Sequence, residues 1–161
     1  MDVIISPSKL CGKIALPSSK SHAIRLIICA ALCDSPTKIG MSGICDDIKA
    51  ALGCAVSLGC EVRRDEKSVT VIPNAVPASR VFDCGESATL LRLLLFVAAA
   101  TGGGELLRRG SLIKRDMTPI TDILTAHGVS VTTENEKITL SGKLSGNEFF
   151  VPANISSQYL S

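Results

Sequence analysis

The chain nearly repeats itself, and this feature constrains its fold more than any other. Two segments, LGCEVRRDEKSVTV and HGVSVTTENEKITL, share an alternating apolar pattern, a polar turn and a second alternating stretch. Each follows an apolar-periodic helix that stops at a glycine, Gly59 in the first copy and Gly128 in the second. Self-similarity of this kind predicts two copies of one supersecondary unit, at about residues 13–72 and 81–141, joined by polar connectors.

Each copy is predicted to fold as β-α-β-α-β-β. The predicted elements of the first copy are, in chain order, Lys13–Leu16, Lys20–Cys33, Thr37–Gly40, Asp46–Leu58, Cys60–Arg64 and Ser68–Ile72. Those of the second copy are Val81–Asp83, Ser87–Ala100, Glu105–Arg108, Thr118–His127, Val129–Thr133 and Lys137–Ser141.

A third copy begins near the end of the sequence. It has a predicted strand at 148–151 and a helix that opens at Asn154, and the sequence ends at Ser161. One helical turn cannot bury an apolar face or complete a layer. We therefore expect residues 1–161 to form a partial domain of α/β (α+β) class, with two full units and the truncated start of a third at about 148–161.

Composition excludes several function classes. Aromatic residues are 3% of the chain, which disfavours modules that stack nucleic-acid bases. The formal net charge of +2 is too small for a general binder of nucleic-acid phosphates. The apolar run at 90–100 is interrupted by Arg92 and is too short to span a membrane, and no signal-peptide pattern follows Met1. We expect a soluble cytoplasmic protein with neither nucleic-acid nor membrane partners.

The seven cysteines are odd in number and form no C-x-x-C pair, which favours reduced thiols over a zinc site or a disulfide framework. No pairing of a nucleophile with a base is evident. Five cysteines lie in patterns typical of small core residues: Cys29, Cys33, Cys54, Cys60 and Cys84. His127, at a helix C-terminus before Gly128, is interpreted as a surface residue that suits the helix dipole.

The residues most typical of a binding site cluster where the first helix of each copy begins. These segments read SSKSHAIR, CGESATLLR and NISSQ. A helix start offers unpaired backbone N–H groups and partial positive charge, so it favours an anion. Serine hydroxyls there can cap the helix or bind ligand oxygens, and for a single serine capping is the commoner role. Three equivalent starts favour one shared anionic ligand.

Two arginines stand in unusually apolar surroundings. Arg25 is flanked by Ile24 and Leu26, and Arg92 has the same context in the second copy. A guanidinium in that setting requires a carboxylate or phosphate partner. Lys20 lies at the mouth of its helix, with Arg25 one turn deeper.

On these residues the chain resembles the 5-enolpyruvylshikimate-3-phosphate (EPSP) synthase family. The matching motifs occur in order along the sequence: LPSSKSHAIR, CDDI, DCGESATLLR, Lys114-Arg115-x-Met117 and SSQYL. The resemblance implies an inside-out α/β barrel domain, incomplete here, with helices inside and sheets outside. It also implies transfer of enolpyruvyl from phosphoenolpyruvate to the 5-hydroxyl of shikimate-3-phosphate, through a tetrahedral intermediate and without a metal or organic cofactor.

The resemblance also implies roles for individual residues. Lys20 corresponds to the catalytic lysine between the two substrates, and Ser21 and Arg25 correspond to a pair that holds shikimate-3-phosphate. Ala88, through its backbone N–H, and Arg115 correspond to phosphoenolpyruvate-binding positions. The clamp on the shikimate phosphate and ring hydroxyls corresponds to Ser156, Ser157 and Gln158, and further candidate binding residues are Glu86, Ser87, Thr89 and Arg92.

Three positions depart from the family pattern. Ser18 and Ala88 stand where glycine is usual, and Asp116 stands where proline is usual. We expect the Ala88 methyl to weaken glyphosate-like inhibitors, and the Asp116 carboxylate to draw the Arg115 guanidinium away from ligand. The family's acid and base carboxylates lie in the second domain, so the present chain is expected to bind substrate without turning it over.

Two alternatives remain open. The sister enzyme that transfers enolpyruvyl to UDP-N-acetylglucosamine shares the fold and the donor, but it usually has Lys-Asn where this chain has Lys20-Ser21 and lacks the SSQ segment. The other alternative is a non-catalytic isolated or split half-enzyme that serves as a binding or assembly domain.

Overall fold

The computed structural model describes residues 3–9, 11–74 and 79–152. Residues 20–72, called the first unit here, contain five elements: α1 (Lys20–Ala31), β1 (Thr37–Gly40), α2 (Asp46–Ser57), β2 (Glu61–Asp65) and β3 (Ser68–Ile72). The strands form an antiparallel sheet in the order β1-β3-β2. The central β3 carries the buried Val69 and Val71, which face the helices of the unit.

Residues 81–142, called the second unit, add a leading strand and a short 3-10 helix to the same plan. Their elements are β4 (Val81–Asp83), α3 (Ala88–Ala100), β5 (Gly104–Leu107), η1 (Gly110–Lys114), α4 (Thr118–Ala126), β6 (Val129–Thr133) and β7 (Lys137–Gly142). The sheet order is β4-β5-β7-β6. Only β4 and β5 pair in parallel among these strands, because α3 forms the crossover between them.

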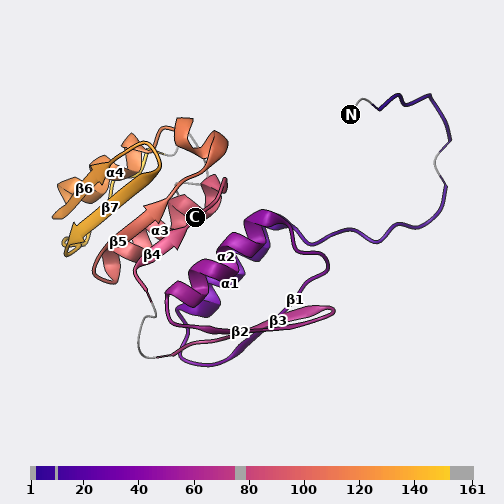
Figure 1. The fold of residues 1–161 in the computed structure, drawn as a ribbon, viewed down its shortest axis with the longest axis horizontal. Coiled ribbons are helices and arrows are strands. Elements are labelled where there is room, and N and C mark those ends of the chain that lie inside the picture. The colour runs from indigo at the N-terminus through magenta and orange to yellow at the C-terminus, as the bar shows by residue number, and fades with distance from the viewer. Residues whose placement is uncertain (1–2, 10, 75–78, 153–161) are drawn as a thin grey trace.

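The two units share one hydrophobic core. In Figure 1, α1 and α2 lie on the side of the first sheet that faces the second unit, and α1 contacts α3 while α2 contacts β4. Ile24, Leu52 and Leu94 are 0–2% exposed and belong to the same buried cluster. Phe82 is the single buried aromatic residue in the described ranges. Aliphatic helices therefore supply most of the packing, as the composition predicts.

Most predicted elements are present, and both glycine stops have the expected conformation. Gly59 and Gly128 adopt φ values of +102° and +87°, directly after the C-terminal turns of α2 and α4. Residues other than glycine rarely adopt this left-handed backbone conformation, so a glycine ends each helix and turns the chain toward its hairpin. The predicted α+β class is confirmed.

Two predicted strands are wrong. Residues 13–16 form no strand, and Ile14 and Leu16 are 85% and 76% exposed. The described part of residues 3–16 runs away from the folded body in Figure 1. Residues 148–151 likewise have no strand pairing in the described structure. An alternating apolar pattern needs a neighbouring strand to complete its hydrogen bonds, and no described strand lies beside either segment. The helix predicted at 154–158 lies outside the described residues.

Two of the cysteines predicted for the core are exposed. Cys29 and Cys33 lie on the solvent side of α1 and just beyond its end, whereas Cys54, Cys60 and Cys84 are buried. A helix turns by about 100° per residue, so small residues can fall on either face, and the pattern of Cys29 was misassigned. Burial raises the pKa of Cys60, and hydrogen bonding with Cys54 together with burial raises that of Cys84. Those two thiols are poor nucleophiles at neutral pH.

None of the helices in the described residues is long and apolar enough to cross a lipid bilayer.

Candidate functional site

The start of α1 presents a lysine and a set of uncapped backbone donors. Lys20 is the first residue of the helix, and the N-cap residue Ser19 makes no side-chain capping bond. The Lys20 ammonium lies 3.1 Å from the carboxylate of Asp47, which belongs to the first turn of α2. The ion pair therefore joins the starts of two helices. It leaves Lys20 about half exposed, with its side chain 54% accessible.

Arg25 folds back toward this same helix start. Its Nη1 atom donates a hydrogen bond to the backbone oxygen of Ser21 at 3.1 Å. Both residues are half-buried, and the neighbouring Ile24 is fully buried. Helix side chains lean toward the N-terminus, so a guanidinium one turn deep reaches the mouth. The structure thus gathers Lys20, Ser21 and Arg25 at one end of α1.

The start of α3 is also uncapped. Ser87 is its N-cap, is 1% exposed, and makes no side-chain capping bond. Its hydroxyl oxygen has no hydrogen-bond partner among the described residues. Thr89 is 7% exposed and Ala88 is half-buried at the first position of the helix. The common capping role predicted for single serines is therefore absent at Ser19 and Ser87, so neither N-cap side chain accepts a bond from the first N–H groups of its helix.

Glu86, just before α3, does not reach into the helix that follows. Its Oε2 atom accepts the backbone N–H of Ser111 at 3.0 Å and the Ser111 hydroxyl at 2.8 Å. These two bonds lower the pKa of the Glu86 carboxyl, against a smaller opposing effect from burial and from the charge of Asp47. Glu86 thereby connects the start of α3 to η1.

A bidentate ion pair also holds the residue that directly precedes η1, Arg109. Asp83, the last residue of β4, contacts the Arg109 guanidinium at 2.7 Å and 3.0 Å. The hydrogen bond from Arg109 is the main cause of the lowered pKa of Asp83. The backbone N–H of Arg109 also donates to the oxygen of Gly85 at 2.8 Å.

Arg115 caps the C-terminal end of η1 and is exposed. The expectation that Asp116 draws its guanidinium aside is wrong for the described structure, because no ion pair joins these two side chains there. Asp116 instead accepts the backbone N–H of Thr118 at 2.9 Å, which satisfies a donor at the start of α4. Hydrogen bonding with the side chain of Thr118, and then with its backbone, lowers the pKa of Asp116.

Of the remaining candidate residues, the structure describes one and leaves three outside the described ranges. Arg92 is half-buried on α3, one helical turn beyond Ala88. Ser156, Ser157 and Gln158 lie outside the described residues. The described residues contain no group of three His, Cys, Asp or Glu side chains placed to hold a metal ion.

Sequence reasoning missed two charged contacts. Asp47 was identified only as part of the CDDI motif, although a carboxylate at a helix start can also pair with a lysine on a neighbouring helix. Arg108 was not singled out, yet it is 5% exposed and donates to the backbone oxygens of Glu134 and Asn135. An arginine that ends an apolar strand was the available signal for such a buried anchor.

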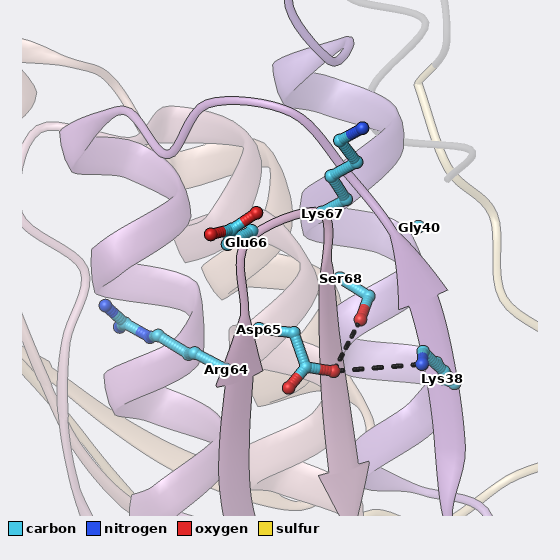
Figure 2. Close-up of a pocket in the computed structure, with 7 residues that line it drawn as sticks. All are labelled: Lys38, Gly40, Arg64, Asp65, Glu66, Lys67 and Ser68. Carbon is cyan, nitrogen blue, oxygen red and sulfur yellow. Dashed lines mark hydrogen bonds and ion pairs between the residues drawn. The ribbon is translucent and has the colours of Figure 1, made fainter.

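A broad hollow of about 840 Å³ lies elsewhere, at the tip of the β2–β3 hairpin (Figure 2). Its charges largely compensate each other: Asp65 accepts from Ser68 at 2.9 Å and lies 3.7 Å from the Lys38 ammonium. Arg64 and Lys67 point in different directions in Figure 2. These side chains do not converge on one ligand, so the helix starts remain the candidate site.

Comparisons with known proteins identify the family. The family model for EPSP synthase (3-phosphoshikimate 1-carboxyvinyltransferase) matches residues 4–161. This chain belongs to the EPSP synthase family. The family prediction made from the helix-start motifs is therefore confirmed.

Among its curated relatives are 3-phosphoshikimate 1-carboxyvinyltransferases from Clostridium beijerinckii and Methanocorpusculum labreanum. They are 34% and 29% identical over 97% and 100% of this chain. The chain spans 39% and 40% of the length of these two relatives. A solved EPSP synthase from Acinetobacter baumannii matches with a TM-score of 0.75 and 25% identity, covering 92% of this chain and 37% of that one.

Proposed function

We propose that this chain supplies one wall of the active site of an enzyme that transfers enolpyruvyl from phosphoenolpyruvate to the 5-hydroxyl of shikimate-3-phosphate. The observation that carries the proposal is the uncapped start of α1, where Lys20 is the first residue and the Arg25 guanidinium folds back to the backbone oxygen of Ser21. A helix start with an ammonium and a guanidinium beside it has the charge and the donors that a phosphate monoester needs.

The reaction consumes no redox equivalent. The 5-hydroxyl oxygen bonds to C2 of phosphoenolpyruvate, the hydroxyl proton leaves, and C3 takes up a proton. The tetrahedral intermediate then loses phosphate from C2 and a proton from C3, which restores the enolpyruvyl group on its new oxygen. In this scheme Lys20 stabilises phosphate charge between the two substrates, and Arg115 with the Ala88 N–H holds phosphoenolpyruvate.

Ser21, Arg25 and the Ser156-Ser157-Gln158 segment would hold shikimate-3-phosphate, with Arg92, Ser87 and Thr89 as additional candidates around the α3 start. The acid and base groups are expected from a second domain, which is the partner that this proposal requires. We therefore expect the 161-residue chain to bind shikimate-3-phosphate and to be inactive alone. The reaction needs no cofactor, and the free thiols of the seven cysteines support a cytoplasmic location.

The test is a titration of the isotopically labelled chain, followed by amide NMR. Shikimate-3-phosphate should shift the amides of residues 20–25, and shikimate should bind at least about tenfold more weakly because it lacks the charged group. UDP-N-acetylglucosamine is the control for the sister activity. Tighter binding of the UDP-sugar, or unmoved amides at 20–25 with saturating shikimate-3-phosphate, would contradict the proposal. Steady phosphate release with both substrates would refute inactivity.

The Ala88 methyl gives a second test, in an enzyme that carries this chain together with its second domain. Ala88 is half-buried at the first turn of α3, where it replaces the usual glycine. Ala88→Gly should increase sensitivity to glyphosate several-fold, measured as inhibition at fixed phosphoenolpyruvate, because the removed methyl frees space beside the backbone N–H. Unchanged inhibition would show that the methyl does not reach the inhibitor.

A further inference from the structure

The contact between Glu86 and Ser111 joins two segments that the proposed function treats separately. Glu86 precedes α3, whereas Ser111 lies in η1, which ends next to Arg115. The Glu86 carboxylate receives both donors of Ser111, the backbone N–H and the hydroxyl. Hydrogen bonds to a charged acceptor are the stronger kind, so this contact restrains the start of η1.

Gly110 lies directly beside this carboxylate. A Cβ atom at Gly110 would lie 2.5–2.6 Å from the carboxyl atoms of Glu86, closer than real contacts allow. The residue also has a φ of +50°, in the left-handed region that disfavours side chains. The backbone at residue 110 therefore passes close to the Glu86 carboxylate, and the positive φ is what favours glycine at this position.

The 3-10 helix transmits this restraint to Arg115. Leu112 is fully buried and fixes the middle of the turn in the core. Its backbone oxygen accepts the N–H of Arg115 at 3.1 Å, and its own N–H donates to Arg109. Between Ser111 and Arg115 there is only one short turn, held at its start by Glu86 and at its centre by Leu112. Displacing the start of the turn would move the Arg115 backbone.

Glu86 is poorly suited to contact an anionic substrate directly. An ionised carboxylate only accepts hydrogen bonds, and so does a fully ionised phosphate, so the two repel each other. The bonds from Ser111 lower the pKa of Glu86 and keep it ionised at neutral pH. A carboxylate can therefore assist phosphate binding here by holding protein donors in place.

We infer that Glu86 is a positioning residue that fixes η1, and through it places Arg115 for the phosphate of phosphoenolpyruvate. This inference rests on the proposed function for the role of Arg115. It gives the acidic residue of the CGES segment a task on the protein itself, in place of the direct substrate contact expected from the sequence. Gly110 and Ser111 take part in the same contact, since Ser111 donates to the Glu86 carboxylate and Gly110 lies against it.

The first test measures the restraint without any substrate. In the 161-residue chain, Glu86→Ala should accelerate hydrogen exchange of the Ser111 and Arg115 amides by about tenfold or more, because their turn opens more often. Glu61→Ala, which removes an exposed carboxylate paired with Arg63 on β2, is the matched control and should leave those amides unchanged. Exchange that is unaltered in Glu86→Ala would overturn the inference.

The second test asks whether Glu86 acts through Arg115. Glu86→Ala should weaken phosphoenolpyruvate binding by about tenfold, while Glu86→Gln, which keeps an acceptor oxygen, should lose less. In an Arg115→Gln background, Glu86→Ala should have less than about a twofold further effect, as expected for two residues that act as one unit. If Glu86→Ala still weakens phosphoenolpyruvate binding about tenfold in the Arg115→Gln background, the inference is overturned. That result would indicate a direct contact of Glu86 with the substrate or general damage to the fold.

The two readouts separate this inference from the proposed function. If the unaltered chain binds neither substrate while Glu86→Ala still accelerates exchange at Ser111, the restraint stands and the substrate assignment fails. If the unaltered chain binds shikimate-3-phosphate, and hydrogen exchange at Ser111 is the same in that chain and in Glu86→Ala, the proposed function stands and the role of Glu86 fails.

Discussion

The first and second units follow one plan but differ in how the chain enters their second helix. In the first unit, five residues connect β1 to α2, and the acidic Asp46 and Asp47 open that helix. In the second unit, the connector from β5 to α4 contains η1, followed by Arg115, Asp116 and Met117. The repeated elements place the helix starts, and the unequal connectors determine which charged groups lie beside them.

The starts of the leading helices differ in the same way. At α1 the prominent charges are the cations Lys20 and Arg25. Just before α3 stands the carboxylate of Glu86, which is directed to Ser111. Under the proposed function, both helix starts receive an anion, and the second differs in that its carboxylate also ties the α3 start to η1.

The largest expected effect tests whether the two units are separable. Leu94 of α3 is fully buried in the core that both units share. Leu94→Ala should lower the free energy of unfolding by about 2–5 kcal/mol, and it should accelerate hydrogen exchange in β3 as well as in β7. Leu26→Ala on α1, where the side chain is 40% exposed, is the matched control with a small effect. Destabilisation confined to residues 81–142 would show that the units unfold independently.

The next effect distinguishes the two arginines at equivalent places in the repeat. Arg25→Gln should weaken shikimate-3-phosphate binding by roughly ten- to a hundredfold, because it removes the guanidinium that the proposed function assigns to the phosphate. Arg92→Gln should have a smaller effect, because the nearby α3 start carries the Glu86 carboxylate. Calorimetric titration of both variants against shikimate-3-phosphate would measure the difference. Equal losses would mean that both helices contact the phosphate alike.

The folded part of the chain was largely predictable because its signals are local. Apolar periodicity, the acidic start of α2 and the glycines after α2 and α4 define element ends within a few residues. The strands predicted at 13–16 and 148–151 failed because a strand depends on a partner that the local sequence does not specify. The 3-10 helix at 110–114 was missed because one short turn leaves no periodic pattern.

The site was predictable in its residue types and less so in its contacts. The helix-start motifs identified Lys20, Ser21 and Arg25, which the structure gathers at one helix end. The pairing of Lys20 with Asp47 joins residues 27 positions apart, and that of Glu86 with Ser111 joins residues 25 apart. No spacing rule for a single helix or hairpin reaches that far, so such contacts follow only from the packing of helices on each other.

A smaller effect tests how closely the helix stops of the two units correspond. Gly59→Ala and Gly128→Ala each place a side chain at a strongly positive φ, so each should lower the free energy of unfolding by roughly 1–2 kcal/mol. At Gly128 the added methyl also meets Lys143 O at 3.2 Å and Ser145 Oγ at 3.1 Å. Urea unfolding of both variants would compare them. A cost at one glycine only would show that the other turn relaxes easily.

The smallest effect concerns how two exposed ion pairs, one taken from each unit, respond to acid. Hydrogen bonds from Lys49 lower the pKa of Asp46 in the first unit, and those from Arg109 lower the pKa of Asp83 in the second. A carboxyl whose pKa is lower in the folded than in the unfolded state stabilises the fold above its unfolded pKa, near 4, and loses that contribution as the pH falls through the folded value.

Carbon-detected NMR titration should therefore find both carboxyls ionised below pH 4, with Lys49→Gln raising the pKa of Asp46 alone and Arg109→Gln that of Asp83 alone. The bidentate pair should withstand 0.5 M salt better than the single Lys49–Asp46 contact, because Arg109 donates to both carboxylate oxygens of Asp83, from Nε to Oδ1 and from Nη2 to Oδ2. If salt shifts both pKa values equally, then the contact between β4 and the η1 connector is no firmer than a surface pair within one helix. In that case the restraint on this connector would come from Glu86 and Leu112 rather than from Arg109.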